Sequence, residues 1–582
     1  MAAPVTLRLD ATYLPASGAP GTMHLRLVNL GPNPVRGFRL AVTSVVPMTP
    51  PSDGSTRLVA RISGWHQLAP PDGFELRPGA VWELDPLACG HRPGHANDGP
   101  ASAYVVLADG STRAVALGAT DRGSRPRVGA EAAPALSLVE RDGVAAAAWA
   151  AAATCEQRVH PRDAVVLSPE GDPVSAVVVK GLAPEQYEVL EEGKRFLVRA
   201  GSRTALQWAL LAMARHRRGE IEVIHGRQEP CRGWRGLHVD VARQFVPAAD
   251  VEWLIEVAAW HRLNRVHLHL TDDEGWRLTV SGYPALTDVA AWRGDGCAVP
   301  PLLGSGADPT GGWYSSGTIA TWVDRAGELG IEVVPEVDLP GHCFAALAAL
   351  PELRDADDAS GAVSVQHFAG NVLNPGVDAT WPFLEAVIGE LADRFPSPWL
   401  HLGGDEVPHG AWRRSPAAQR WAAERGIAGT DAIAASFLRQ VIDVVRASTG
   451  RQVGVWQEAA ESGALDPGAG YVVAWKSVDD VRRLVSAGHQ VVAAPAPWYY
   501  LDHAADDDWW SPGASWAGQT SLDDVARFDV TAGWSAGERA ALLGIQACLW
   551  TEHVHDLATL RRLLLPRLTL IADAAWTRHN SF

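Results

Sequence analysis

The chain has 582 residues, of which 47% are hydrophobic and 20% charged, so it is long enough for about two to four globular domains with a substantial core. A formal net charge of −17 argues against nucleic acid or an anionic membrane as the main partner. The sequence has no uncharged apolar run of about 18 residues that predicts a membrane span. Tryptophan is unusually frequent, with 24 copies against 11 Phe and 8 Tyr. Indole rings fill cores, and they also stack on sugars, bases or cations.

The start of the chain, residues 1–10, lacks the basic segment and the apolar run of a secretory signal, so we expect a cytoplasmic protein, of bacterial origin. The six cysteines lie far apart, without a Cys-x-x-Cys pair. This spacing predicts reduced thiols, with neither a zinc site nor a disulfide framework.

Two smaller domains are predicted at the N-terminal end. Residues 1–125 consist of short alternating runs broken by Gly and Pro, which is typical of an antiparallel β-sandwich. Residues 121–126 have the composition of a linker. Residues 130–230 combine strand-like runs with one helical pattern at 204–215, and this predicts a small α+β domain.

Residues 232–582 repeat the order strand, loop, helix. Eight strand-like runs alternate with helical patterns, which predicts a (β/α)8 TIM barrel of the α/β class. The runs are 236–241, 265–270, 331–336, 399–403, 452–456, 471–475, 490–494 and 544–549. The helix after the first run is expected to begin at Asp250, ahead of an apolar stripe of helical period. In this fold the chemistry belongs at the carboxyl ends of the strands.

The fourth strand runs into His-Leu-Gly-Gly-Asp-Glu at 401–406. The two glycines allow a sharp turn, so Asp405 and Glu406 need not point to opposite sides. Two crowded carboxylates repel, and one then keeps its proton to higher pH while the other stays ionised. An acid/base hydrolase needs this division of roles. The alternative is an ordinary Asp-Glu pair at the start of a surface loop.

The second and third strands carry histidines and carboxylates. His267 and His269 share one face of the second strand, and His-x-His on a barrel strand can hold zinc if His342 or His401 supplies a further ligand. Neighbouring carboxylates such as Glu336 satisfy imidazoles equally well. A metal-dependent hydrolase therefore stays open as an alternative.

Tryptophans end several later strands, beside acidic residues. Trp456, Trp475 and Trp550 each come at or just after a strand-like run. One such residue alone indicates barrel packing, whereas three beside carboxylates indicate flat walls for a sugar ring.

These motifs together resemble the family 20 glycoside hydrolases, the β-N-acetylhexosaminidases. The matching segments occur in the family's order from residue 232 onward: 235–240 with Arg243, 269–277, 311–314, 336–342, 373–375, 401–406, 456–458, 500–502 and 546–552. The two N-terminal domains are similar to those that precede the barrel in this family.

The resemblance implies a retaining, substrate-assisted hydrolysis, in which the second carboxylate is not the nucleophile. Glu406 is expected to be the general acid and later the base, and Asp405 to hold the 2-acetamido N–H so that the acetamido oxygen attacks C1 and forms an oxazolinium ion. Further residues are expected to bind the substrate: Tyr500 at the acetamido oxygen, Trp456, Trp475 and Trp550 around it, Arg235, Asp502 and Glu552 at the hydroxyls, and Asp272 and His342 in support.

The expected substrate is thus a small oligosaccharide or glycoconjugate, such as a chitooligosaccharide, that ends in β-linked N-acetylglucosamine or N-acetylgalactosamine. No metal or other cofactor is implied, and we expect a monomer or homodimer. Glu274 and Cys343 depart from the family's usual residues and place an extra negative charge and a thiol near the site. A catalytically silent sugar-binding protein is a third hypothesis, disfavoured by the complete set of site residues.

Overall fold

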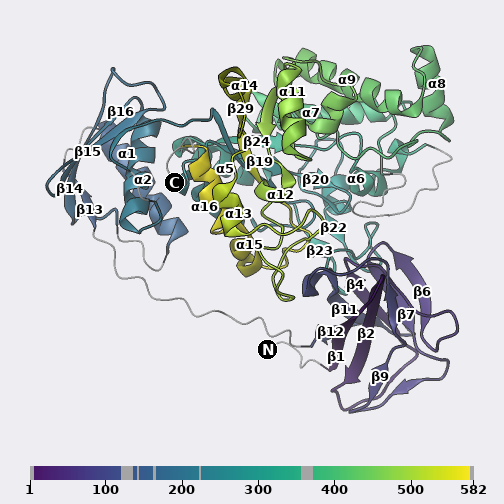
Figure 1. Cartoon of the computed structure of the whole chain (residues 1–582). Coiled ribbons are helices and arrows are strands. Elements are labelled where there is room, and N and C mark those ends of the chain that lie inside the picture. Colours follow the sequence, from purple (N-terminus) through teal and green to yellow (C-terminus); the bar gives the residue numbers. More distant parts are fainter. Residues whose placement is uncertain are drawn as a thin grey trace.

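The computed structural model describes residues 6–118, 135–139, 143–161, 166–221, 224–355 and 371–576. Its centre is a closed barrel of eight parallel strands (Figure 1). In barrel order the strands are β18 (Trp234–Asp240), β19 (Arg265–His269), β24 (Glu332–Glu336), β25 (Trp399–His401), β26 (Gln452–Trp456), β27 (Gly470–Ala474), β28 (Gln490–Ala493) and β29 (Leu542–Leu549). All eight agree with the predicted runs, so the TIM barrel is confirmed. Strand β25 ends earlier than expected, since the chain turns at Gly403 with φ +64°.

Helices follow the strands around the barrel. The larger ones are α3 (Ala248–Trp260), α5 (Ser316–Glu328), α7 (Thr380–Arg394), α8 (Pro416–Glu424), α9 (Thr430–Thr449), α11 (Val478–Ser486), α15 (Leu557–Leu564) and α16 (Arg567–Ala574). Shorter helices are α4 (Ala285–Asp288), α6 (Phe344–Ala349), α10 (Gln457–Glu461), α12 (Ala496–Tyr499), α13 (Leu522–Arg527) and α14 (Ala536–Ala541). Helix α3 begins two residues before Asp250, after Pro247, so the expected start at Asp250 was wrong. Asp250 instead lies in the first turn, where an acidic side chain favours the helix dipole.

The N-terminal domain is all-β, as expected. Its ten strands belong to one hydrogen-bonded sheet, in which nine strands form a continuous path and β9 pairs with β2 beside it. The strands of this sheet are β1 (Leu7–Ala16), β2 (Ala19–Asn29), β4 (Arg39–Ser44), β5 (Met48–Thr49), β6 (Arg57–Ile62), β7 (Trp65–Ala69), β9 (Val81–Glu83), β10 (Leu87–Cys89), β11 (Pro100–Val106) and β12 (Thr112–Leu117). Both halves of the path contribute to one core, in which Leu27, Leu40, Val42 and Leu68 are fully buried.

The second domain combines a five-stranded sheet with two helices, one more than expected. The strands are β13 (Leu136–Leu138), β14 (Asp172–Val178), β15 (Tyr187–Glu192), β16 (Arg195–Ala200) and β17 (Gly226–Gln228). Helix α2 (Arg203–Arg217) covers the predicted pattern and is capped by Ser202. Helix α1 (Gly143–Val159) was missed because its many alanines give no amphipathic period. The predicted linker at 121–126 lies outside the described residues.

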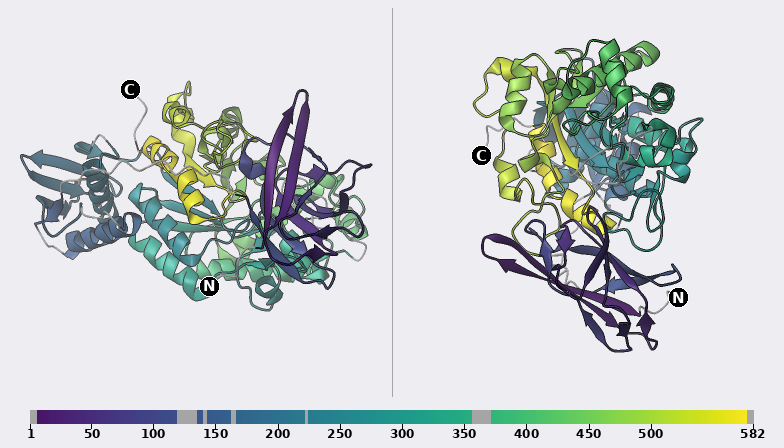
Figure 2. Two further views of the ribbon diagram at one scale, coloured as in Figure 1. Left: turned by 90° about the horizontal axis from the view of Figure 1, so that it is seen from below. Right: turned by 90° about the vertical axis from the view of Figure 1, so that its right-hand side faces the viewer.

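The two smaller domains lie on opposite sides of the barrel (Figures 1 and 2). Helices α1 and α2 pack against barrel helix α3, whereas the N-terminal domain meets the barrel near β22 (Trp292–Arg293) and β23 (Thr310–Gly311). Among the described helices, none is both long and apolar enough to cross a membrane.

Candidate active site

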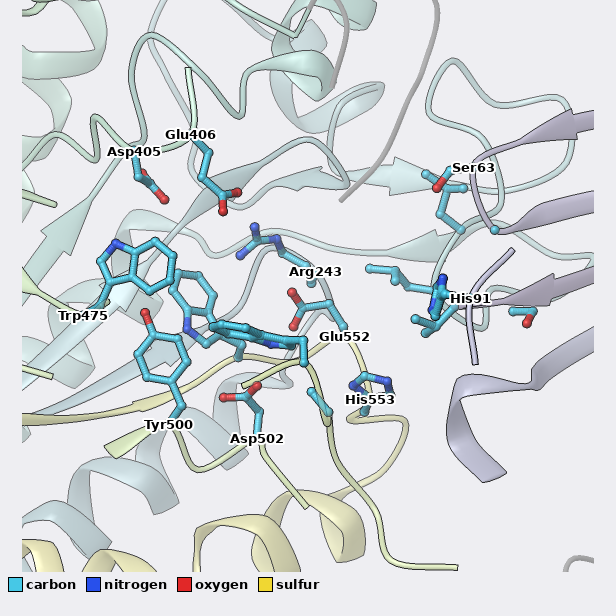
Figure 3. Close-up of a pocket in the computed structure, with 18 of the residues that line it drawn as sticks. Ser63, His91, Arg243, Asp405, Glu406, Trp475, Tyr500, Asp502, Glu552 and His553 are labelled. Carbon is cyan, nitrogen blue, oxygen red and sulfur yellow. The ribbon is translucent and has the colours of Figure 1, made fainter. Parts of the chain in front are cut away.

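A cavity of about 410 Å³ lies at the carboxyl ends of the barrel strands, a size within the roughly 300–1,000 Å³ of ligand pockets (Figure 3). Most of the predicted site residues line it: Asp405, Glu406, Trp456, Trp475, Tyr500, Asp502, Trp550 and Glu552. Segments up to 147 residues apart therefore meet at one site. Carboxyl ends of parallel strands share one end of the barrel, which explains this convergence.

The Asp405–Glu406 pair stands on a turn that glycines make possible. The backbone has positive φ at Gly403 (+64°), Gly404 (+95°) and Glu406 (+46°). A Cβ on Gly403 would lie 1.7 Å from Asp338 Oδ1, so a larger residue does not fit there. A positive φ is uncommon for glutamate, and such strain is concentrated at functional sites. Both carboxyl groups thereby reach the cavity (Figure 3).

His342 connects this pair to a buried charge network behind the cavity wall. Its Nε2 lies 3.8 Å from Asp405 Oδ2 and 3.6 Å from Glu406 Oε2. Its Nδ1 is bonded to Asp272 Oδ1 at 3.1 Å, and Asp272 Oδ2 accepts a 2.8 Å bond from Arg243. Asp272 and His342, which were expected among the substrate-binding residues, do not line the cavity and lie behind its wall.

Burial and the charges of the network act on the protonation of His342 and Glu406. Burial alone lowers the pKa of His342, but the carboxylates of Asp272 and Asp338 outweigh burial and raise that pKa well above 6.5. Burial raises the pKa of Glu406, and the Asp405 charge adds to the rise while His342 opposes it. Glu406 therefore keeps its proton to higher pH than a free glutamic acid, as a general acid must.

Tryptophan and tyrosine rings form the walls of the cavity. Trp456 donates from Nε1 to the buried Glu336 at 2.8 Å, and Trp475 donates from Nε1 to Glu458 at 3.1 Å. Each indole is therefore held by a carboxylate on its outer side. Tyr500 stacks on Trp475 with ring centroids 6.3 Å apart. Rings fixed in this way present flat, preorganised surfaces to a ligand.

Arg243, Asp502 and Glu552 also line the cavity (Figure 3). Asp240 holds the segments that carry Arg243 and Glu552, since its Oδ1 accepts from Arg243 N at 3.1 Å and its Oδ2 from Thr551 N at 3.1 Å. Burial and the nearby Glu552 raise the pKa of Asp502 to about 8. Burial also raises the pKa of Glu552, against the charge of Arg243. A guanidinium and two carboxyl groups offer donors and acceptors for sugar hydroxyls.

Arg235 does not line this cavity, so its predicted contact with substrate is wrong. It lies near the amino end of β18, where its guanidinium bonds Glu185 of the small domain at 3.0 Å and the carbonyls of Arg232 and Arg262. The guanidinium also lies over Trp208 at 4.8 Å. Arg235 therefore joins the barrel to the small domain, and Arg243 is the arginine of the site.

Two contributions to the cavity went unrecognised in the sequence. Trp516, 60% exposed, lines the cavity after Asp502 and has its ring 6.1 Å from that of Trp475. Five residues of the N-terminal domain also line it: Ser44, Val45, Ser63, Gly64 and His91. The high tryptophan count is the one sequence signal that pointed toward Trp516. No local pattern marks the residues of the N-terminal domain as part of the site.

The histidines of the metal hypothesis surround Glu336 beneath the cavity. His267, His269 and His401 contact its carboxylate at 3.1, 2.9 and 2.8 Å. Burial lowers the pKa of His267 to about 3, so this imidazole is neutral. His267, Glu336 and His401 have ligand atoms close enough to hold a metal ion. The contacts with Glu336 also fit the alternative to metal binding, in which a neighbouring carboxylate satisfies the imidazoles.

Glu274, which departs from the family's usual residue, lies beside Arg243. Its Oε2 is 3.5 Å from Arg243 Nε, and the same guanidinium also donates to Asp272. The extra charge thus acts on the site arginine. The Cys343 thiol bonds the carbonyl of Asp338 at 3.3 Å and is buried beside the same network.

A barrel with an acid pair on a strained strand end, facing aromatic walls, is the arrangement of the barrel glycoside hydrolases. Comparison with known proteins narrows this class. The pattern described as "Glycosyl hydrolase family 20, catalytic domain" matches residues 233–579. The chain belongs to this family.

Two similar proteins of known name are both called β-hexosaminidase. The one from Vibrio furnissii is 37% identical over 344 residues, which cover 59% of this chain and 56% of that protein. The one from Akkermansia muciniphila is 32% identical over 353 residues, 59% of this chain and 68% of that protein. The match thus spans little more than half of the Vibrio furnissii protein.

A solved structure is similar over nearly the whole chain. The family 20 exo-β-N-acetylglucosaminidase of Vibrio harveyi, in complex with N-acetylglucosamine, has a TM-score of 0.84 and 26% identity. The likeness covers 99% of this chain and 96% of that one. It therefore includes both domains before the barrel.

Proposed function

We propose that the protein is a retaining exo-β-N-acetylhexosaminidase, which removes terminal β-linked N-acetylglucosamine or N-acetylgalactosamine through an oxazolinium intermediate. The family membership and the names of the similar proteins support the class of substrate. The mechanism is supported by the surroundings of the acid pair.

The observation that carries the proposal is the state of Asp405. Its Oδ1 is buried and accepts no hydrogen bond from the described residues, although Asp405 lines the cavity. A buried acceptor of this kind is costly unless a ligand supplies a donor. The N–H of a 2-acetamido group is such a donor. Its bond to Asp405 turns the acetamido oxygen toward C1, and the Asp405 charge stabilises the positive ring that forms.

The reaction then needs one proton donor. As the acetamido oxygen attacks C1, the bond from C1 to the glycosidic oxygen breaks, and Glu406 gives its proton to that oxygen. In the second step, the Glu406 carboxylate takes a proton from a water molecule that attacks C1 and opens the oxazolinium ring. The raised pKa of Glu406 suits the first role, and two displacements at C1 retain the configuration.

The other residues around the cavity have roles that follow from their groups. Tyr500 donates to the acetamido oxygen, and Trp456, Trp475 and Trp550 enclose the acetamido group and the sugar face. Arg243, Asp502 and Glu552 hold the hydroxyls of the terminal sugar, which makes the enzyme exo-acting. The exposed Trp516 supplies a surface for the leaving group.

Turnover of an aryl N-acetyl-β-glucosaminide, run beside the corresponding galactosaminide, tests the proposal. We expect release of the aryl group, and no release from the β-glucoside that lacks the acetamido group. EDTA should leave the rate unchanged, because no step uses a metal ion. Equal rates on the glucoside, or loss of activity with EDTA, would contradict the proposal and favour the metal hypothesis at His267 and Glu336.

A further inference from the structure

The N-terminal domain meets the barrel at the active site itself. Its 3-10 helix η1 (Ala96–Asp98) is bonded to the loop that follows β28. Ala96 N donates to Trp509 O at 2.8 Å, and Asn97 Nδ2 donates to Gly513 O at 3.1 Å. This loop runs between Asp502 and Trp516, which both line the cavity. The η1 turn thus holds one wall of the site in place through hydrogen bonds.

The second contact of η1 is an ion pair with the loop that follows β29. Asp98 Oδ1 lies 3.2 Å from Nε2 of His553, the residue next to Glu552. Asp98 is 6% exposed and His553 7%, so the pair is shielded from water. The other oxygen of Asp98 accepts from Gly94 N at 2.7 Å and His95 N at 3.1 Å. The carboxylate therefore has a fixed position before it meets the barrel.

The same turn also holds a cavity-lining segment of its own domain. The carbonyl of Asp98 accepts from Val46 N at 2.9 Å and from Ser44 Oγ at 3.0 Å. Ser44 and Val45 line the cavity. Asp98 is therefore the point at which a wall from the N-terminal domain and a wall from the barrel are joined.

Four groups face the His553 imidazole: Asp98 from the N-terminal domain, Glu552 from its own loop, and Asp502 and His503 from the loop after β28. Figure 3 shows His553 beside Glu552 and Asp502. Burial lowers the pKa of His553, but Asp98 and the other carboxylates outweigh burial and raise that pKa above 6.5. The imidazolium in turn stabilises the charged forms of Asp502 and Glu552.

We propose that Asp98 is a positioning residue of the active site: through its bond to His553 it fixes the segment that carries Glu552, so that the N-terminal domain takes part in binding the terminal sugar. This inference rests on the proposed function of the barrel. The N-terminal domain is then a component of the catalytic unit rather than a separate sugar-binding module.

The test compares full-length variants in the aryl N-acetyl-β-glucosaminide assay. Asp98→Asn keeps the size of the side chain and removes the charge. We expect KM to rise roughly 5- to 10-fold with a smaller change in kcat, since loss of the charge weakens the contact with His553 by about 1–1.5 kcal/mol and the segment that binds substrate is held less firmly. We also expect KM to rise with pH as His553 loses its proton and its contact with Asp98 weakens. Because the pKa of His553 falls without the Asp98 charge, this rise of KM should begin at a lower pH in Asp98→Asn than in the wild type.

A control and a second variant separate positioning from stability. Ser102→Ala removes a different bond between the domains, from Ser102 Oγ to Ser305 O at 2.5 Å. It should lower Tm without changing KM or its pH dependence. His553→Gln, on the barrel side, should raise KM as Asp98→Asn does, even if the Asp98 variant does not fold. In the double variant the two effects should not multiply, because both remove the same contact.

Wild-type KM and pH dependence in folded Asp98→Asn, or effects that multiply in the double variant, would overturn the proposal. If the wild type shows no turnover, the proposed function has failed instead. In that case the affinity of the same variants for N-acetylglucosamine, measured by calorimetry, still tests Asp98. Unchanged affinity in Asp98→Asn and His553→Gln would overturn the positioning role.

Discussion

Replacement of Asp405 by asparagine tests the carboxylate on which the proposed substrate assistance depends. The amide has the same shape but no charge, so it cannot stabilise the oxazolinium ion. The loss combines a hydrogen bond to a charged group, about 1.5–3 kcal/mol, with electrostatic stabilisation of the kind that is worth about 10²–10³ in rate at other preorganised sites. We therefore expect kcat to fall roughly 10²- to 10³-fold in Asp405→Asn, with little change in Tm.

The same variant should carry a second signature, in its pH profile. The Asp405 charge raises the pKa of Glu406, so its removal lowers that pKa. The general acid must be protonated, and activity is lost as the pH rises through its pKa. The alkaline limb of kcat/KM should thus move to lower pH in Asp405→Asn, measured with the aryl N-acetyl-β-glucosaminide. Activity within a few-fold of the wild type, or an alkaline limb that moves to higher pH, would refute the reasoning.

Three further predictions follow from the same contacts. Glu406→Gln should keep the affinity for substrate but lose most turnover of sugars with poor leaving groups; a uniform loss for good and poor leaving groups would contradict its role as acid. Arg243→Met should raise KM. Arg235→Met should leave KM unchanged but lower the free energy of unfolding by about 1–3 kcal/mol, because this substitution leaves buried carbonyls unpaired. Kinetics and denaturant titration distinguish the two variants. Asp502 has a folded-state pKa of about 8, far above its unfolded value, so its contribution to stability falls as the pH rises between the two. The Tm of Asp502→Asn should therefore increase relative to that of the wild type as the pH rises toward 8, while its KM is higher than that of the wild type. A Tm difference that is constant with pH would contradict this prediction.

The barrel and its acid pair could be predicted because their signals are local. Alternation of strands and helices gives the barrel, and Gly403 and Gly404 mark the turn before Asp405 and Glu406. Arg235 in the first strand and Arg243 just after it show where such reasoning ends. Five residues of extended strand, about 16 Å, separate Arg235 from Asp240 at the carboxyl end. The motif alone does not say which arginine faces the cavity, and only the packed barrel separates them.

The wall from the N-terminal domain lay beyond sequence reasoning for a different reason. Asp98 and His553 are 455 residues apart, and the bond between them depends on how two domains pack. The path of the N-terminal sheet is of the same kind, since pairing between distant strands sets it. Helix α1 was missed at the local level, because alanine favours a helix without marking one of its faces.

The central claim is that the substrate's acetamido group is the nucleophile, and inhibition by a cyclic thiazoline analogue of the oxazolinium ion tests it most directly. An enzyme that forms this intermediate binds its stable mimic far more tightly than the substrate. We predict an inhibition constant at least about 100-fold below the KM of the aryl N-acetyl-β-glucosaminide. An inhibition constant equal to KM or above it would contradict the account.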